Sequence, residues 1–445
     1  MSLITQAVKG TQDVLPGESD KWQYIENVCI QTARLFGYRE IRTPVFEHTE
    51  LFERGVGDTT DVVQKEMYTF VDKGGRSITL RPEMTASAVR AASEHGLIFD
   101  ALPVKACYIG GCYRSEKPQA GRLREFHQFG AELFGAPSPA ADAEMIAFVR
   151  AVFDTLGIEN INLELNSIGC PGCRAEYNAS LKTYYADHVD TICETCKSRL
   201  DRNPMRLLDC KNNSCSKIAA NAPRMLDHLC DDCAGHFEKV KANLDSMEIE
   251  YMINPSIVRG LDYYTKRVFE FTSTDLGAQS TVCGGGRYDG LFAALGVKDT
   301  SAIGFAMGLE RLLMVMEAQG CPFPEPEKVL VYLAPMGDAA LAKCLSLCKQ
   351  LRDEGFAAET DLCGRSLKAQ MKYADKMGAK FTCVIGDSEL ESGAVSLKNM
   401  ATGEKTETDL DGGILDTVYN LSIQATLSNI EETFAGFEAL MGGEE

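Results

Sequence analysis

Long apolar runs are missing from this 445-residue sequence. No stretch of eighteen or more apolar residues occurs, so we expect no helix that crosses a membrane. The opening residues, MSLITQAVKGTQDVLPGE, also lack the basic segment followed by an apolar one that is typical of a secretion signal. The expected location is therefore the cytoplasm.

Positive charge is scarce, since 45 lysines and arginines stand against 64 aspartates and glutamates, for a formal net charge of −19. This balance argues against a protein that grips nucleic acid over its whole surface, but it does not exclude a local basic groove. One basic cluster consists of Arg114, Lys117, Arg122 and Arg124. Another recurs every four residues, near one face if the segment is helical, and consists of Lys368, Lys372, Lys376 and Lys380. The alternative for these lysines is a solvated helix face.

Familiar catalytic motifs are also missing. The six histidines are scattered, neither GxSxG nor HExxH occurs, and His127 is interpreted as a core histidine. The glycine-rich CGGGRYDG fits neither a dinucleotide-binding loop nor a P-loop. Its glycines indicate only that a ligand or another strand approaches the backbone closely. An enzyme with this sequence would work through positioning and charge stabilisation, without a nucleophile of its own.

The order of strand and helix patterns predicts an α+β fold, an antiparallel sheet with helices, followed by a small α/β module. A helix is expected over 18–36, and strands over 37–52 and 257–271. The expected division is a first part of the core at 1–169, a cysteine-rich insertion at 170–252, a second part of the core at 253–322, and the C-terminal module at 328–430. A proline-rich linker, CPFPEPEK, precedes that module.

Cysteine is abundant, with 17 residues, and eight of them fall between positions 170 and 233. CETC and CKNNSC could form one tetrahedral thiolate Zn²⁺ site from Cys193, Cys196, Cys210 and Cys215. CPGC and CDDC would provide a second set. The alternative is free thiols in a reducing cytoplasm, where disulfides are not expected.

Three arginines, Arg114, Arg259 and Arg311, lie in separate segments beside small or aromatic residues. The guanidinium group is always charged and presents a planar fork of donors suited to phosphate. Three of them converging on one pocket would hold a polyphosphate, whereas a single one is more often a structural salt bridge.

Six motifs occur in an order that resembles the histidyl-tRNA synthetase family, which is a class II aminoacyl-tRNA synthetase family. They are KGTQDVLP near the start, LRPEMTA at 80–86, YRSEKPQAGRLREFHQFGAE at 113–132, RGLDYYTKRVFEF at 259–271, GGGRYDGL at 284–291 and GFAMGLERLL at 304–313. The resemblance implies the antiparallel-sheet core of class II synthetases. It also implies a histidine–tRNA ligase that makes histidyl-adenylate from L-histidine and ATP, and then charges tRNA(His).

For catalysis, the resemblance places Arg259 and Arg114 on the α-phosphate of ATP and Arg311 on the γ-phosphate. The substrate carboxylate is then the nucleophile, and Mg²⁺ shares the charge of the phosphates. Little acid–base chemistry is asked of the protein, in agreement with the missing histidine motifs.

For histidine, the resemblance implies that Glu132 and Tyr264 read the two nitrogens of the imidazole. The groups expected at the α-amino and α-carboxylate ends are Glu83, Thr85 and Gln128, with Tyr288 completing that wall. We expect Tyr263 to pack elsewhere, because neighbours on a strand face opposite ways. The family has a glycine where this sequence has Met84, so the methionine side chain must point away from the amino acid or the loop must shift.

The C-terminal module resembles the class II anticodon-binding domain, which makes its lysines candidates for contact with RNA. The loop at 115–124 would lie beside the acceptor end of the tRNA, and the first motif, REIRTPVFEHTELF, implies a homodimer. Three alternatives are a regulatory, histidine-sensing synthetase-like subunit that makes no adenylate, an RNA-binding protein, and a class II synthetase for another amino acid. The first is discounted because all three arginines and the C-terminal module are present.

Overall fold

The structure is a computed structural model that describes residues 5–57, 60–210, 212–326, 328–424 and 427. The chain divides into two compact units, Met1–Pro324 and Glu325–Glu445. Among the described residues, no helix combines the length and the apolar character needed to cross a bilayer.

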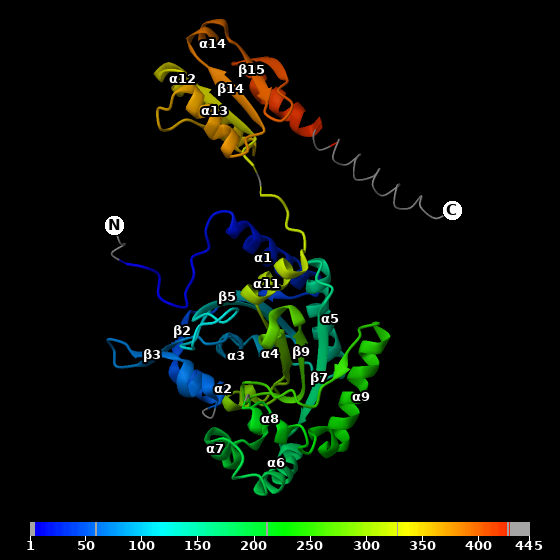
Figure 1. Cartoon of the computed structure of the whole chain (residues 1–445). Helices are drawn as coiled ribbons and strands as arrows, with labels where there is room; N and C mark the ends of the chain where they lie inside the picture. The colour runs from blue at the N-terminus through cyan, green and yellow to red at the C-terminus, as the bar shows by residue number, and fades with distance from the viewer. Residues whose placement is uncertain (1–4, 58–59, 211, 327, 425–426, 428–445) are drawn as a thin grey trace. The chain divides into compact units, whose positions relative to one another are not determined.

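The first unit is built on an eight-stranded sheet with the order β1-β5-β6-β11-β10-β9-β7-β8 (Figure 1). The strands are β1 (Arg39–Glu40), β5 (Val104–Tyr113), β6 (Glu125–Phe134), β7 (Asn162–Gly169), β8 (Met252–Ile253), β9 (Thr265–Thr272), β10 (Thr281–Arg287) and β11 (Ala302–Gly308). Within this sheet the central pairs are antiparallel, and the outer pairs β1–β5 and β7–β8 are parallel. The predicted α+β class with an antiparallel sheet is confirmed.

Successive side chains of β6 point to opposite faces of this sheet, and their packing identifies the two faces. Phe129, Ala131 and Leu133 point into the main core with α1, α5 and α11, whereas Phe134 joins a second cluster with α3 and α10. Glu132 is two residues before Phe134 and therefore shares its face. The helices of the unit outside the insertion are α1 (Glu18–Leu35), α2 (Thr49–Val56), α3 (Thr85–Glu94), α4 (Leu97–Asp100), α5 (Pro139–Thr155), α10 (Leu291–Ala294) and α11 (Leu309–Gln319), with shorter turns η1 (Val62–Glu66) and η4 (Thr274–Gln279).

The strand predicted over 37–52 is wrong as a single element. The structure has β1, then β2 (Phe46–His48) in a small sheet with β4 (Ser77–Leu80) and β3 (Tyr68–Val71), and α2 begins at Thr49. Phe52 and Val56 are four residues apart and fully buried, which is a helical spacing that the β-rich start of the segment obscured.

The strand predicted over 257–271 is also shorter than expected, because β9 begins at Thr265. Residues 257–264 form an irregular segment, called the histidine-motif loop below. Lys266, just inside the strand, has a left-handed φ of 52°, and the pairing of β7 with β9 shifts register between Ser167 and Gly169. The aromatic and apolar residues of the loop are buried by tertiary packing, which imitates the composition of a strand.

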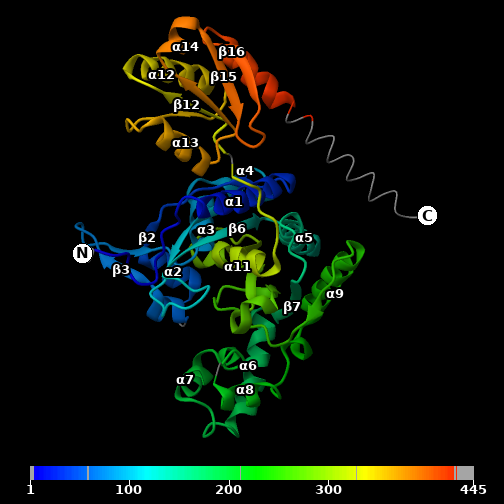
Figure 2. The same cartoon turned by 45° about the horizontal axis from the view of Figure 1, so that its top comes forward.

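The cysteine-rich segment folds as short helices between β7 and β8. They are α6 (Pro171–Ala186), α7 (Glu194–Arg202), η2 (Pro204–Leu207), α8 (Asn213–Ala219), η3 (Met225–His228) and α9 (Asp231–Ser246). Helices α6, α7 and α8 gather at one end of the unit in both views, and α9 runs along α5 (Figure 2).

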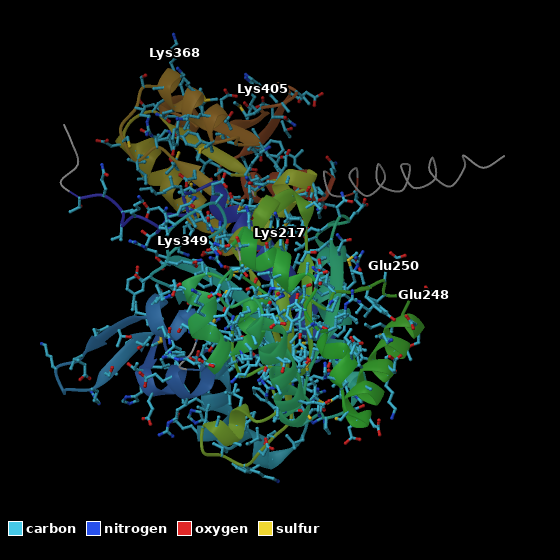
Figure 3. The ribbon with its side chains drawn as sticks, turned by 60° about the horizontal axis from the view of Figure 1, so that its bottom comes forward. Lys217, Glu248, Glu250, Lys349, Lys368 and Lys405 are labelled. Carbon is cyan, nitrogen blue, oxygen red and sulfur yellow. The ribbon has the colours of Figure 1, made fainter. Side chains whose placement is uncertain are left out.

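The second unit has a five-stranded sheet with the order β13-β12-β14-β15-β16. Its elements are β12 (Val331–Pro335), α12 (Asp338–Asp353), β13 (Ala358–Thr360), α13 (Leu367–Lys376), β14 (Phe381–Ile385), α14 (Asp387–Ser392), β15 (Ala394–Asn399) and β16 (Lys405–Asp409). The four lysines that the sequence suggested as RNA contacts, Lys368, Lys372, Lys376 and Lys380, are all exposed, and Lys368 projects outward in Figure 3. Lys380 lies beyond the end of α13, so only three of the four belong to that helix.

Candidate active site

The centre of the candidate site is a buried carboxylate on β6. Glu132 accepts a hydrogen bond from the hydroxyl of Tyr108 at 2.7 Å and another from the hydroxyl of Tyr288. Burial raises the pKa of Glu132 to about 8, although the two phenol donors work in the opposite direction. The side chain is thus held by two phenol donors, and among the described residues it forms no salt bridge.

Space for this carboxylate comes from the neighbouring strand. Gly304 on β11 pairs with Glu132, and a Cβ added at Gly304 would overlap Oε2 of the glutamate. Sequence reasoning singled out neither Gly304 nor Tyr108. The repeated small residues of GFAMG were the available signal, because they indicate a strand that another group approaches closely.

Tyr263 and Tyr264 lie side by side, and the expectation that they face opposite ways is wrong. Their ring centroids are 4.7 Å apart, and Tyr263 also meets the ring of Tyr288 at 5.5 Å. The strand rule failed because these residues precede β9. Burial raises the pKa of both phenols, so both are neutral donors. Tyr263 therefore belongs to the aromatic group around Glu132.

Glu83 occupies the start of α3, where its carboxylate accepts from the backbone N–H groups of Thr85 at 2.8 Å and Ala86 at 2.9 Å. Burial raises the pKa of Glu83, and these two N–H donors oppose the shift. The hydroxyl of Thr85 lies 3.4 Å from that of Tyr108, which links this helix start to Glu132. Met84 is buried in the apolar cluster that contains Val89 of α3. Its sulfur lies 3.3 Å from the position that a Cβ on Gly110 would take.

Gln128 shares the face of β6 with Glu132, and its side-chain carbonyl accepts from the thiol of Cys112 at 3.3 Å. The neighbouring His127 faces the other way. Its backbone N–H and ring Nδ1 lie 2.9 and 3.1 Å from the carboxylate of Glu310, and Trp22 packs edge-on to its ring at 5.1 Å. His127 pairs with Glu310, but its side chain is 35% exposed, so the interpretation as a core histidine is wrong.

Arg259 lies in the histidine-motif loop and reaches across the sheet. Its guanidinium group pairs with Glu270 of β9, and a Cβ added at Gly284 of β10 would overlap it. This confirms that a glycine of CGGGRYDG permits a close approach. The Nε of Arg259 is buried and has no hydrogen-bond partner among the described residues, so a donor is left for an added acceptor.

Arg311 connects to Arg259 through a short polar chain. It donates to the carbonyl of Thr281 at 2.6 Å, and the hydroxyl of Thr281 donates at 2.8 Å to Glu270, the partner of Arg259. Burial lowers the pKa of Arg311, and the nearby cations Arg122 and Arg114 lower it further. The arginines predicted from sequence therefore gather at one region, where their mutual repulsion would be relieved by an anion.

Arg114 approaches this group from β5. Its Nε donates to the carbonyl of Pro82 at 2.9 Å, and its guanidinium carbon lies 5.1 Å above the ring of Phe126. The bond from Nε and the contact with an aromatic face hold this guanidinium group in place.

Comparisons with known proteins agree with this geometry. A family model described as histidyl-tRNA synthetase matches residues 10–312, and one described as anticodon binding domain matches residues 330–414. This chain belongs to the histidyl-tRNA synthetase family. The family resemblance drawn from the sequence motifs is therefore confirmed.

Relatives in this family cover nearly the whole chain. The histidine–tRNA ligase of Acetivibrio thermocellus is 59% identical over 409 residues, which are 92% of this chain and 98% of that protein. The ligase of Caldanaerobacter subterraneus is 54% identical over 92% of this chain and 98% of that protein. The apo histidyl-tRNA synthetase of S. aureus, a crystal structure, superposes with a TM-score of 0.80 at 39% identity, covering 93% of this chain and all of that one.

The insertion brings its eight cysteines into two groups of four. The basal cluster consists of Cys170, Cys173, Cys230 and Cys233, and the distal cluster of Cys193, Cys196, Cys210 and Cys215. Within each cluster the four sulfurs all lie within 4.8 Å of one another. None of the eight forms a disulfide, and the structure brings together both sets expected from the sequence.

Proposed function

We propose that this chain is a histidine–tRNA ligase. It activates L-histidine with ATP to histidyl-adenylate, releases pyrophosphate, and transfers histidine to the 3′ end of tRNA(His). The observation that carries the proposal is the buried carboxylate of Glu132. Two phenols donate hydrogen bonds to it, and Gly304 leaves the space that it occupies. The chain that holds it belongs to the histidyl-tRNA synthetase family. A buried acceptor of this kind binds a ligand that donates a hydrogen bond to it more tightly than a ligand that does not.

Adenylate formation needs the α-phosphorus of ATP held in line with the substrate carboxylate. The carboxylate attacks, the bond to the pyrophosphate breaks, and pyrophosphate leaves with the electron pair. Arg259 and Arg114 stabilise the charge on the α-phosphate, and Arg311 holds the γ-phosphate. ATP enters as its Mg²⁺ complex, which shares this charge. The Nε of Arg259, which has no hydrogen-bond partner in the part of the chain that the structure describes, and the gathered positive charge support these roles.

Histidine is recognised at both ends. Glu132 accepts from one imidazole N–H, and Tyr264 meets the other ring nitrogen. Glu83, Thr85 and Gln128 hold the α-amino and α-carboxylate groups, and Tyr288 keeps Glu132 in place. These roles are supported by the hydrogen-bond network that links Thr85 to Tyr108 and Tyr108 to Glu132. Met84 is compatible with it, because its side chain packs toward Gly110.

The remaining parts serve tRNA and assembly. Residues 328–430 bind the anticodon region, 170–252 are the insertion, and 1–169 with 253–322 form the catalytic core. The exposed apolar side chains of Val45 and Phe46, in the first motif, support a homodimer. The enzyme works in the cytoplasm, and a structural Zn²⁺ bound by Cys193, Cys196, Cys210 and Cys215 stabilises the insertion.

Histidine-dependent exchange of pyrophosphate into ATP tests the proposal on the purified chain. Exchange with histidine, and with none of the other amino acids, is expected. Absence of exchange in a folded protein that still binds histidine would favour the histidine-sensing subunit instead. Exchange with a different amino acid would contradict the assignment of Glu132 and Tyr264.

A further inference from the structure

The two cysteine clusters share a local design. Each contains a CxxC pair at the start of a helix, with Cys170, Cys193 and Cys230 directly before α6, α7 and α9. A backbone N–H donates to a sulfur in each cluster, from Cys230 to Cys173 at 3.1 Å and from Cys193 to Cys215 at 3.2 Å. Donors of this kind stabilise thiolates, which are the form that binds metal.

The spacing within each cluster fits one tetrahedral ion. The sulfurs of Cys170 and Cys173 are 3.6 Å apart, and those of Cys193 and Cys210 are 3.8 Å apart. Four thiolates at about 2.3 Å from a Zn²⁺ ion lie about 3.8 Å from one another. A disulfide would bring two sulfurs to about 2.05 Å, so neither pair is bonded.

The basal cluster lies where the insertion leaves the catalytic core. Cys170 follows Gly169, the last residue of β7, whose φ of 62° lets the chain turn directly into the cluster. A Cβ at Gly169 would crowd the Cβ of Cys173, so the two segments are closely packed. Arg174, the residue after Cys173, donates to the carbonyl of Tyr264 at 3.3 Å. This cluster therefore fixes a side chain that holds the backbone of the histidine-motif loop.

The chain segment between the cysteines of the distal cluster makes a second set of contacts with the same loop. Cys193 and Cys196 lie at the start of α7, and Cys210 follows η2. The segment between Cys196 and Cys210 is therefore anchored to the cluster at both of its ends. Within that segment, Asn203 donates to Asp262 at 3.1 Å, and Arg206 donates to the carbonyl of Gly260. Both acceptors belong to the histidine-motif loop, between Arg259 and Tyr264.

We infer that both clusters are Zn²⁺ tetrathiolate sites, and that together they position the histidine-motif loop through Arg174, Asn203 and Arg206. The three are positioning residues, because they reach the substrate-binding groups only through the loop. A pocket of about 550 Å³ lies between the insertion and this loop, so the loop is not held there by close apolar packing alone. The inference about histidine binding rests on the proposed function, whereas the metal content stands independently of it.

Metal content is measured first, by native mass spectrometry and elemental analysis of untagged protein. Two Zn²⁺ per chain are expected. Cys196→Ser and Cys233→Ser should each lose one, whereas Cys363→Ser, which changes an exposed cysteine of the second unit, should keep both. No bound metal, a disulfide-bonded chain, or iron in place of zinc would overturn the assignment. The wild-type count decides this even if the cysteine variants fail to fold.

Positioning is then measured with variants that leave every cysteine in place. Asn203→Ala and Arg174→Ala should weaken histidine binding, measured by calorimetry without ATP, by about 5- to 20-fold, which corresponds to one or two lost hydrogen bonds. In exchange assays the KM for histidine should rise with kcat little changed, and both zinc ions should remain. Lys217→Ala, which changes an exposed residue of α8 labelled in Figure 3, is the matched control.

Unchanged histidine affinity in both variants, with two zinc ions bound, would overturn the positioning role. Wild-type protein that neither binds histidine nor supports exchange would instead contradict the proposed function, and the zinc count would still stand.

Discussion

The hydroxyl of Tyr288 donates a hydrogen bond to Oε2 of Glu132, and both side chains are at most 1% exposed. Tyr108 donates to the other oxygen of the same carboxylate. Each oxygen thus has one donor before any substrate arrives, and each keeps capacity for another. In the role proposed for Glu132, the acceptor for the imidazole would be fixed in advance, and little reorganisation would be needed on binding.

Glu132→Gln is expected to lower kcat/KM for histidine by about 100-fold, because an acceptor oxygen is lost and the amide turns donors toward a phenol. The KM for ATP should change by less than about threefold. Pyrophosphate exchange at varied histidine and ATP gives both values. The control is Glu144→Gln, which changes the residue of α5 that pairs with Lys105 of β5. Equal losses for both substrates would contradict the assigned role.

The raised pKa of Glu132 predicts a pH dependence of stability. Its ordinary pKa of 4.5 rises to about 8 in the folded chain, so the folded state binds the extra proton between these values. The associated stability is complete below about pH 4.5 and is lost as pH rises toward 8, by at most about 1.4 kcal/mol per pH unit. Relative to Glu132→Gln, the wild type should therefore lose stability from pH 5 to 8 in urea titrations. A constant difference would show that Glu132 stays charged.

Gly304→Ala is expected to abolish activation of histidine and to lower thermal stability, because the new Cβ would occupy the position of Oε2 of Glu132 and would lie 2.7 Å from the backbone carbonyl of Ala131. The displaced carboxylate would lose its phenol donors. Pyrophosphate exchange and thermal unfolding are the measurements. Gly235→Ala, in α9 with open space around it, is the matched control and should be neutral or slightly stabilising. Normal exchange by Gly304→Ala would mean that Glu132 does not read the substrate from this position.

A buried ion cluster joins the insertion to the core. Asp142 of α5 is fully buried, pairs with Arg267 and Arg287, and lies 3.3 Å from Nε2 of His236 on α9. Asp142→Asn should lower the free energy of unfolding by about 3–5 kcal/mol, because two buried cations lose their counter-charge. Urea unfolding measures this, and Asp154→Asn, a half-exposed partner of Arg150, is the control. A loss below about 1 kcal/mol would contradict the structural role.

Acid should act on the same cluster. Burial raises the pKa of Asp142, but the charges of Arg267 and Arg287 and the contact with His236 outweigh it and hold the pKa well below its ordinary 3.8. The carboxylate therefore adds stability above about pH 4 that is lost as pH falls toward the lower folded pKa. Asp142→Asn should lack this acid-dependent loss, which the same urea titrations at pH 3 to 5 would show.

The sequence was sufficient for the fold class and for Tyr288 beside Glu132, because ordered motifs specify a family even where local patterns are ambiguous. It was not sufficient for Tyr263, whose orientation depends on where β9 begins. Tyr108 and Gly304 escaped notice because their roles exist only through cross-strand pairing with Glu132 and its neighbours. The bridges from Asn203 and Arg206 to the histidine-motif loop join residues more than fifty positions apart, and no local pattern encodes such a contact.

The exposed lysines of α13 provide the last prediction, which concerns tRNA. Lys368 and Lys372 are one helical turn apart and exposed, and replacing both by alanine should raise the KM for tRNA in aminoacylation by about 10-fold. If both contact phosphates, the slope of log affinity against log salt should fall by about one per lysine, because fewer counterions are released. Pyrophosphate exchange should not change, since these lysines lie outside the arginine and histidine sites.

The matched control is the pair Lys349→Ala and Lys405→Ala, which removes the same charge from α12 and β16 of the same unit (Figure 3). If the control pair weakens tRNA binding as much as the α13 pair does, the effect is one of net charge and the lysines of α13 are an ordinary solvated face. If only the α13 pair does so, its charge faces the RNA, because an equal loss of charge elsewhere on the unit leaves binding intact.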